Sequence, residues 1–235
     1  MNHPVLEMTI AAAHDTAQLA GADLTARVER VAAIAAAAAD AVDREARFPA
    51  EAFAALRAER LLGVMLPADL GGEAASLAAI VDLGYRLGQA CGSTAMIFAM
   101  HQACVACVLR HGQQDPWHRM LLRQLADEQL LFASSTTEGM AGGNVRSSAA
   151  PIEREEDGIR LHRAASVVSY GAEADVIVTT ARRAPDAPPS DQVLVVFRRK
   201  DYTLTLGQSW DTLGMRGTCS TGFDLLAAEI GRAHV

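Results

Sequence analysis

The chain has 235 residues, half of them hydrophobic but only 5% aromatic, and its formal net charge at pH 7 is -7. This length can bury the core of one large domain or of two small ones. No cluster of lysine and arginine could neutralise a row of phosphates, so a nucleic acid is not an expected partner. The N-terminus lacks the basic and apolar segments of a secretory signal. We therefore expect a soluble, cytoplasmic protein without a membrane span.

The first half of the sequence has the periodicity of helices. An alanine-rich stretch predicts a first helix with Val28, Val31 and Ile34 on its inward stripe. A second helix is expected over residues 48–63, with Pro49 in its first turn, where the missing N–H costs nothing, and a glycine at its end.

Three more helices follow. The third is predicted because apolar and small residues recur at helical spacing. The residues expected on its inward face are Leu77, Ile80, Val81, Gly84, Leu87, Gly88 and Cys91. Residues 93–110 are apolar almost all round, which predicts a central buried helix. Asp115 as N-cap and Pro116 in the first turn begin the last helix. Its expected inward residues are Trp117, Met120, Leu121 and Leu125.

The polar and sulfur-containing side chains of the central helix have structural interpretations. Cys104 and Cys107 form a C-x-x-C pair, but without further ligands we interpret both as buried core thiols. Free thiols favour a reducing compartment. His101, alone on an apolar helix, is predicted to be a hydrogen-bonded core residue rather than a catalyst.

From Leu130 onward the hydrophobic period changes to two, the period of strands. Strands are expected at residues 176–182, 192–199 and 202–208, and a hairpin turn at 155–158. Separate runs of helices and strands favour two domains over a βαβ fold. The predicted class is therefore α+β, with an all-helical domain over residues 1–129 and an antiparallel β-barrel-like domain over residues 130–235.

The sequence SSTTEGMAGGN, residues 134–144, lies at the junction of these halves. Hydroxyl groups followed by glycines can hold a polar ligand, but the same composition also occurs in a plain surface turn. Within it, Glu138 could be a general base, a ligand anchor or half of a structural ion pair. We favour the ion pair, with Arg216 or another arginine as partner. No metal-ligand spacing or catalytic triad is present.

Four segments, in order, resemble the acyl-CoA dehydrogenase family: residues 48–72, 91–102, 133–144 and 210–221. The third falls where that family has a T-E-P-x-A-G-S-D loop. The resemblance implies that this loop and a second segment hold FAD. The cofactor-binding residues carried over by position are Ser135, Thr137, Gly142, Gly143, Val167, Val168 and Ser169.

The resemblance also implies an activity. Hydride transfer from the acyl β-carbon to the flavin would accompany removal of the α-proton by a carboxylate. The expected partners are an acyl-CoA-like substrate and an electron-accepting protein or oxygen. No catalytic residue is assigned in this chain, because the family's base usually lies in a C-terminal helical bundle. We expect the present chain to be a fragment, inactive alone, of a homo-oligomeric protein.

Several positions depart from the family pattern. The loop has Gly139 for proline and Gly143-Asn144 for Ser-Asp. The family's N-G-x-K is replaced by His162–Ala165, and Val167 stands where an aromatic residue covers the ring. These changes keep two alternatives open, a flavin-dependent monooxygenase of the same fold and a non-catalytic association module. The last seven residues, 229–235, back-translate to a sequence like that of a sequencing-library adapter, so we expect that they are not native.

Overall fold

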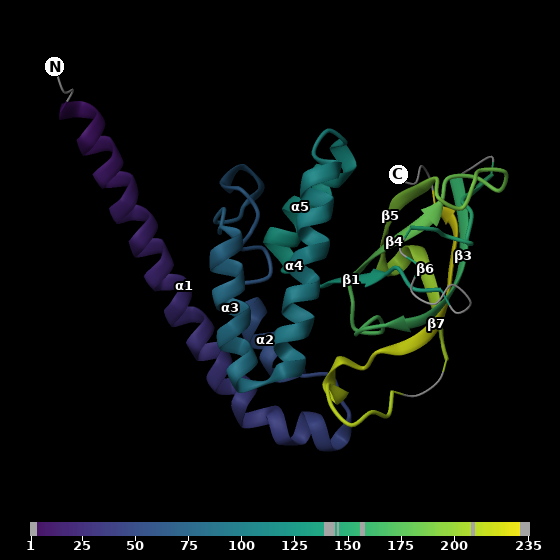
Figure 1. Ribbon diagram of the computed structural model, residues 1–235, viewed down its shortest axis with the longest axis horizontal. Helices are drawn as coiled ribbons and strands as arrows, with labels where there is room; N and C mark the ends of the chain where they lie inside the picture. Colours follow the sequence, from purple (N-terminus) through teal and green to yellow (C-terminus); the bar gives the residue numbers. More distant parts are fainter. Residues whose placement is uncertain (1–3, 139–143, 145, 156–157, 208–209, 231–235) are drawn as a thin grey trace.

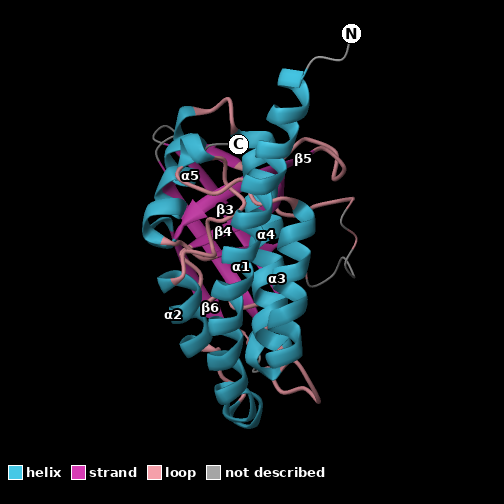
Figure 2. Cartoon of the chain, turned by 90° about the vertical axis from the view of Figure 1, so that its left-hand side faces the viewer, coloured by secondary structure: helices cyan, strands magenta, loops and turns pink. Residues whose placement is uncertain are grey.

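The computed structural model describes residues 4–138, 144, 146–155, 158–207 and 210–230; side chains are described from residue 23 on, except those of 155 and 228–230. Its helices are α1 (Pro4–Glu45), α2 (Ala50–Ala58), α3 (Leu77–Ala90), α4 (Gly92–Gly112) and α5 (Pro116–Glu128). The helices lie together on one side of the molecule and the strands on the other (Figure 1). Figure 2 shows α1, α3 and α4 as a layer in front of the strands.

The predicted stripe on α1 is partly wrong. Val28 and Val31 are buried, but Ile34 is 43% exposed, and the buried stripe continues through Ala35 and Val42 instead. The steps between these four residues are three, four and seven positions, which keep side chains on one face of a helix.

Helix α2 follows Pro49 as expected, but it ends at Ala58, five residues before the predicted glycine. Arg60 adopts a left-handed backbone conformation with a φ of 56°, which ends a right-handed helix. The following Leu61 and Leu62 are buried outside the helix. Their carbonyl groups accept hydrogen bonds from the Gln102 amide of α4, which anchors this connection.

The inward face of α3 differs from the prediction. The Ser76 hydroxyl caps its first turn by accepting a hydrogen bond from the Ala79 N–H at 3.2 Å. The buried residues are Ile80, Leu83 and Leu87. Three residues predicted to point inward are exposed instead: Leu77, Val81 and Gly88. Tyr85 is exposed as well.

The predicted start of α5 is confirmed. The Asp115 carboxylate accepts hydrogen bonds from the N–H groups of Trp117 at 2.8 Å and His118 at 3.0 Å, and Pro116 occupies the first turn. Leu121 and Leu125 are buried as predicted. Met120, in contrast, is exposed, and Trp117 is only half-buried. The other buried residues of α5 are His118, Leu122 and Ala126.

Helix α4 is buried on one face only, although its residues are apolar all round. Phe98, His101 and Val105 are fully buried, whereas Met96 and Cys107 are exposed. The interpretation of both C-x-x-C thiols as core residues is therefore wrong for Cys107 and right for Cys104. By length and composition α4 could cross a membrane, a weak criterion that core helices of soluble proteins also satisfy.

The strands are β1 (Phe132–Ser135), β2 (Glu153–Glu155), β3 (Gly158–Val168), β4 (Val176–Arg182), β5 (Gln192–Arg198), β6 (Tyr202–Leu206) and β7 (Thr221–Ile230). They form a three-stranded sheet, β1-β4-β5, and a four-stranded sheet, β2-β3-β7-β6. The α+β class and the predicted hairpin between β2 and β3 are confirmed. The described strands form two sheets rather than a closed barrel, and β1 pairs with β4 in parallel, unlike the expected antiparallel arrangement.

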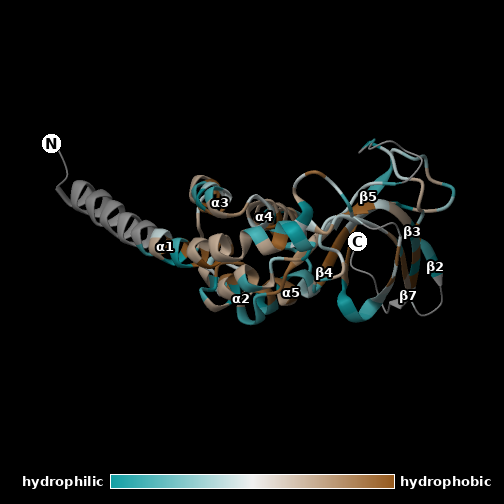
Figure 3. Cartoon of the chain, turned by 90° about the horizontal axis from the view of Figure 1, so that it is seen from below, coloured by the Kyte–Doolittle hydropathy of each residue, from teal (hydrophilic) through white to brown (hydrophobic). Residues whose placement is uncertain are grey.

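The three-stranded sheet is buried on both faces because strand side chains alternate in direction. On β4, Val176 and Val178 join a core cluster with the helices, whereas Ile177 packs in a second cluster with the other sheet. In Figure 3, strands β4 and β5 contain strongly hydrophobic segments, coloured brown. The first cluster crosses the junction at Leu131 and Phe132, so the two halves of the chain share a core.

A short 3₁₀ turn, η3 (Arg216–Thr218), packs against the helices and leaves no room for a side chain at Gly217. A Cβ atom built there meets Val42 Cγ1 and lies 3.0 Å from the Ser93 Cβ atom. We expect Gly217→Ala to destabilise the protein by about 1–3 kcal/mol through overpacking. Urea unfolding would measure the change. Gly214→Ala is the matched control, because a Cβ atom at Gly214 meets nothing within 4 Å. Equal stability of both variants would contradict the prediction.

Candidate functional site

The junction between the two halves is fixed by a buried histidine. His101 of α4 accepts a hydrogen bond at Nδ1 from the Phe132 N–H at 3.0 Å, and its Nε2 lies 2.9 Å from the Leu62 carbonyl oxygen. Since Nδ1 accepts, Nε2 carries the proton and donates to Leu62. Burial lowers the pKa of His101 to about 4, so the ring is neutral. The prediction of a hydrogen-bonded core residue is confirmed, and the bond positions β1 at the entrance of the 134–144 loop.

The two segments assigned by the resemblance meet in the structure. Thr137 donates its hydroxyl hydrogen to the Val167 carbonyl at 2.7 Å and accepts from the Val167 N–H at 3.3 Å. One hydroxyl thus occupies both backbone groups of Val167 and joins the start of the loop to the end of β3. The Val167 side chain is 40% exposed.

A chain of buried hydroxyl groups lies behind the second segment. The Ser169 and Ser220 oxygens are 2.8 Å apart, and the Ser220 and Thr218 oxygens 2.7 Å. Thr218 also lies 2.8 Å from the Met215 carbonyl. This chain of hydroxyl groups connects Ser169, at the end of the second flavin segment, to residues 210–221, the fourth segment of the resemblance.

The remaining predicted residues divide into two groups, a buried pair and two glycines. Ser135 and Val168 are buried, and Ser135 is held through its carbonyl, which accepts a hydrogen bond from Thr179 at 2.5 Å. The Ser135 hydroxyl has no hydrogen-bond partner in the described part of the chain, and neither does the buried hydroxyl of Thr221, which pairs with Val168. Gly142 and Gly143 lie outside the described residues.

Glu138 is a structural carboxylate in an ion pair, as predicted. Its Oε1 lies 3.0 Å from Nη1 of Arg163, and the exposed fractions of the two side chains are 9% and 1%. It also accepts hydrogen bonds from the Ser148 hydroxyl at 2.9 Å and from the N–H groups of Ala149 at 2.7 Å and Ala150 at 3.2 Å. Burial pushes the pKa of Glu138 upward, but these donors and the Arg163 charge outweigh burial and lower it.

Arg216, the named candidate partner of Glu138, is bound elsewhere. Its guanidinium pairs with Asp211 at 2.8 Å and donates to the Asp43 carbonyl at 2.7 Å. The sequence analysis did not identify Arg163 as the partner. Buried and exposed side chains alternate along β3, and Arg163 occupies one of the buried positions. The alternation could have predicted an ion pair, since an arginine on the buried face of a strand requires a carboxylate or carbonyl partners.

Arg163 also fixes the neighbouring backbone. It donates to the Thr180 carbonyl, to the Thr137 carbonyl at 3.3 Å and to the Ser148 hydroxyl at 3.3 Å. Burial lowers the pKa of Arg163. The pair of Glu138 and Arg163 thus ties the start of the loop to residues 148–150 and joins strands β3 and β4.

Comparisons with known proteins identify the chain's relatives. Residues 22–129 match the acyl-CoA dehydrogenase N-terminal domain. Cyclohex-1-ene-1-carbonyl-CoA dehydrogenase of Geobacter metallireducens is 25% identical over 180 residues, 77% of this chain and 47% of that protein. The chain therefore spans about half the length of the known relatives that it matches.

Solved structures share the fold at low identity. Butyryl-CoA dehydrogenase of Megasphaera elsdenii has a TM-score of 0.76 at 15% identity, over 89% of this chain and 56% of that one. FMN-bound TdsC of Paenibacillus sp. A11-2 has a TM-score of 0.77 at 18% identity, over 88% and 52%. The fold is thus the helical domain and two-sheet β-domain of acyl-CoA dehydrogenases. Residues 22–129 thus match the N-terminal domain of this family, and the chain is similar to acyl-CoA dehydrogenases in sequence and fold.

Proposed function

We propose that the chain forms the helical and β parts of an FAD-dependent oxidoreductase that oxidises an acyl thioester. The observation that carries the proposal is the double hydrogen bond between the Thr137 hydroxyl and the Val167 backbone. It brings together the two segments that the resemblance assigns to the flavin. The substrate, an electron-accepting protein or oxygen, a homo-oligomeric state and a cytoplasmic location are parts of the same proposal.

The side chains around Thr137 fit a flat heterocycle with a polar edge. Val167 offers exposed apolar surface beside the loop. The Ser169 hydroxyl is held by Ser220, and the Ser135 and Thr221 hydroxyls lack partners among the described residues. Unpaired buried hydroxyl groups are costly, which favours a polar ligand group near them.

The bound flavin would supply the acceptor for a hydride from the acyl β-carbon. The chain's own residues position it. Thr137 holds the loop against β3, and Ser220 orients the Ser169 hydroxyl. Glu138 is fully engaged by Arg163, Ser148 and two backbone N–H groups, so it stabilises the loop and does not remove a proton.

Thr137→Val tests the proposal. We expect this variant to bind FAD about 5- to 100-fold more weakly, because two backbone groups of Val167 lose their partner and the two segments separate, a loss of about 1–3 kcal/mol. Titration of the apoprotein with FAD, followed by flavin fluorescence, measures the change. Thr137→Ser keeps the hydroxyl and should bind as the unmodified chain does.

Thr203→Val is the matched control, because Thr203 lies on β6 and donates to the Leu226 carbonyl at 3.4 Å. It should leave FAD affinity unchanged. Equal affinity of Thr137→Val and the unmodified chain would contradict the assignment, and absence of flavin binding by a longer protein containing this chain would favour a non-catalytic association module.

A flavin-dependent monooxygenase of the same fold is the second candidate. The small, exposed Val167 favours it, because an aromatic residue is expected there in the acyl-CoA dehydrogenases. The FMN-bound structural relative also makes FMN the alternative cofactor. Bleaching of the flavin by acyl-CoA without oxygen would support the dehydrogenase. Flavin reoxidation that requires oxygen and transfers an oxygen atom to a substrate would support the monooxygenase.

A further inference from the structure

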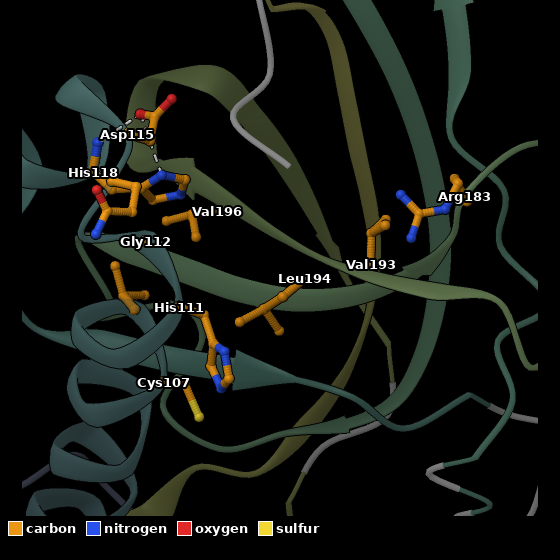
Figure 4. Close-up of a pocket in the computed structure, with 11 residues that line it drawn as sticks. Cys107, His111, Gly112, Asp115, His118, Arg183, Val193, Leu194 and Val196 are labelled. Carbon is orange, nitrogen blue, oxygen red and sulfur yellow. Dashed lines mark hydrogen bonds and ion pairs between the residues drawn. The ribbon is translucent and has the colours of Figure 1, made fainter.

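A cavity of about 600 Å³ lies along β5, between the end of α4 and the start of α5. Figure 4 shows its lining, which includes Cys107 of α4 and three residues of β5, Val193, Leu194 and Val196. Val108 of α4 lines it as well. The volume is within the range of small-molecule sites. No lining residue belongs to the surface around Thr137 and Ser169, so the proposed flavin site does not account for this cavity.

The walls of the cavity are mainly apolar. Leu194 and Val196 are two residues apart on β5, about 7 Å along a strand, and share the face of β5 that packs against the helices, whereas Val193 packs with the other sheet. Val108 of α4 also lines the cavity. A ligand with an apolar body of similar length would bury that body against these side chains, with a gain proportional to the area removed from water.

The charged groups lie at opposite ends of the cavity. Arg183 is at the β4–β5 end, and its Nε donates to the Asp191 carboxylate at 3.0 and 3.2 Å. In Figure 4 its terminal nitrogen atoms point toward Val193, and no partner for them is found in the described part of the chain. Asp115 lies at the other end, where it caps α5. A ligand anion is therefore favoured near Arg183 and repelled near Asp115.

We propose that this cavity binds a small amphipathic carboxylate, that is, an apolar chain with one terminal carboxylate. The carboxylate binds the terminal nitrogen atoms of Arg183, whose planar guanidinium matches two carboxylate oxygens. The chain lies along Leu194 toward Val196 and Val108. This site is independent of the flavin proposal, because it uses none of the same residues.

Cys107 provides a reporter of occupancy. Cys107 is exposed and lines the cavity, whereas Cys91 and Cys104 are buried. The fourth thiol, Cys219, is partly exposed, so the experiment uses a Cys219→Ser background in which Cys107 is the accessible thiol. We expect octanoate to slow the alkylation of Cys107 by uncharged iodoacetamide at least several-fold. Octanol, which has the same chain without the charge, should protect much less. Arg183→Gln should weaken protection by octanoate about tenfold in Kd, to the level of octanol.

Two controls keep the outcome decisive. Lys200→Gln removes an exposed cation that does not line the cavity and should leave octanoate binding unchanged. Cys107→Phe, at an exposed helix position, fills the cavity and should abolish the octanoate heat measured by calorimetry. The proposal is overturned if octanoate gives no protection, if octanol protects equally, or if Arg183→Gln leaves the Kd for octanoate unchanged.

Discussion

Replacement of Arg163 by methionine is expected to destabilise the protein by about 3–5 kcal/mol, the cost of removing one partner of a buried ion pair. The Glu138 carboxylate would stay buried at 9% exposure without its cation. The Thr180 and Thr137 carbonyl groups would lose a donor in the same change. Urea unfolding with a linear extrapolation measures the loss.

The second member of the pair provides the decisive comparison. Adding Glu138→Gln to Arg163→Met removes the uncompensated charge, so the double variant should be more stable than Arg163→Met alone. The exposed pair of Arg183 and Asp191 is the matched control. Arg183→Gln should cost less than about 1 kcal/mol, because water screens exposed pairs. A cost for Arg163→Met as small as that of Arg183→Gln would contradict the buried-pair argument.

Acidification from pH 7 to pH 4 is expected to lower the free energy of unfolding by about 3 kcal/mol through His101 alone. The pKa of His101 falls from 6.5 to about 4 because burial disfavours the charged ring. As the pH falls, His101 is therefore protonated at a higher pH in the unfolded chain than in the folded chain. Stability from the neutral ring is fully present above pH 6.5 and is lost as the pH falls toward 4.

His101→Gln isolates this contribution. Glutamine cannot titrate, so the variant should lose most of the pH dependence between pH 6.5 and pH 4.5. At pH 7.5 it should be less stable by about 1–3 kcal/mol, because the Phe132 N–H is left buried without its acceptor. Unfolding by urea at a series of pH values gives both numbers. Parallel stability curves for the variant and the unmodified chain would show that His101 is not buried in its neutral form.

Much of the β-domain could be predicted from local sequence. The strand over residues 176–182 has the predicted bounds, and β5 ends within one residue of its prediction. Strands β2 and β3 pair in antiparallel up to Glu155 and Gly158, the two ends of the predicted hairpin turn. Alternating β-branched residues and turn residues act over a few positions, so neighbouring sequence contains the necessary information.

The exposed faces of the helices could not be predicted in the same way. Leu77, Val81 and Met120 are as apolar as the buried residues beside them, yet they face outward. Periodicity shows which residues share a helix face, but the neighbouring elements decide which face is covered. The same limit explains Cys107, which lies on the outer face of α4 and lines the cavity along β5.

Local sequence was sufficient to predict the α+β class, the change from helix to strand near Leu130, the N-cap of α5 and the family resemblance, because each depends on residue types at short spacing. The folded arrangement was needed to show that Glu138 pairs with Arg163 rather than Arg216, and that Thr137 meets Val167. These partners are 25 and 30 residues apart in the chain, and a buried charge or hydroxyl is satisfied by whichever group the packed strands bring within hydrogen-bond distance.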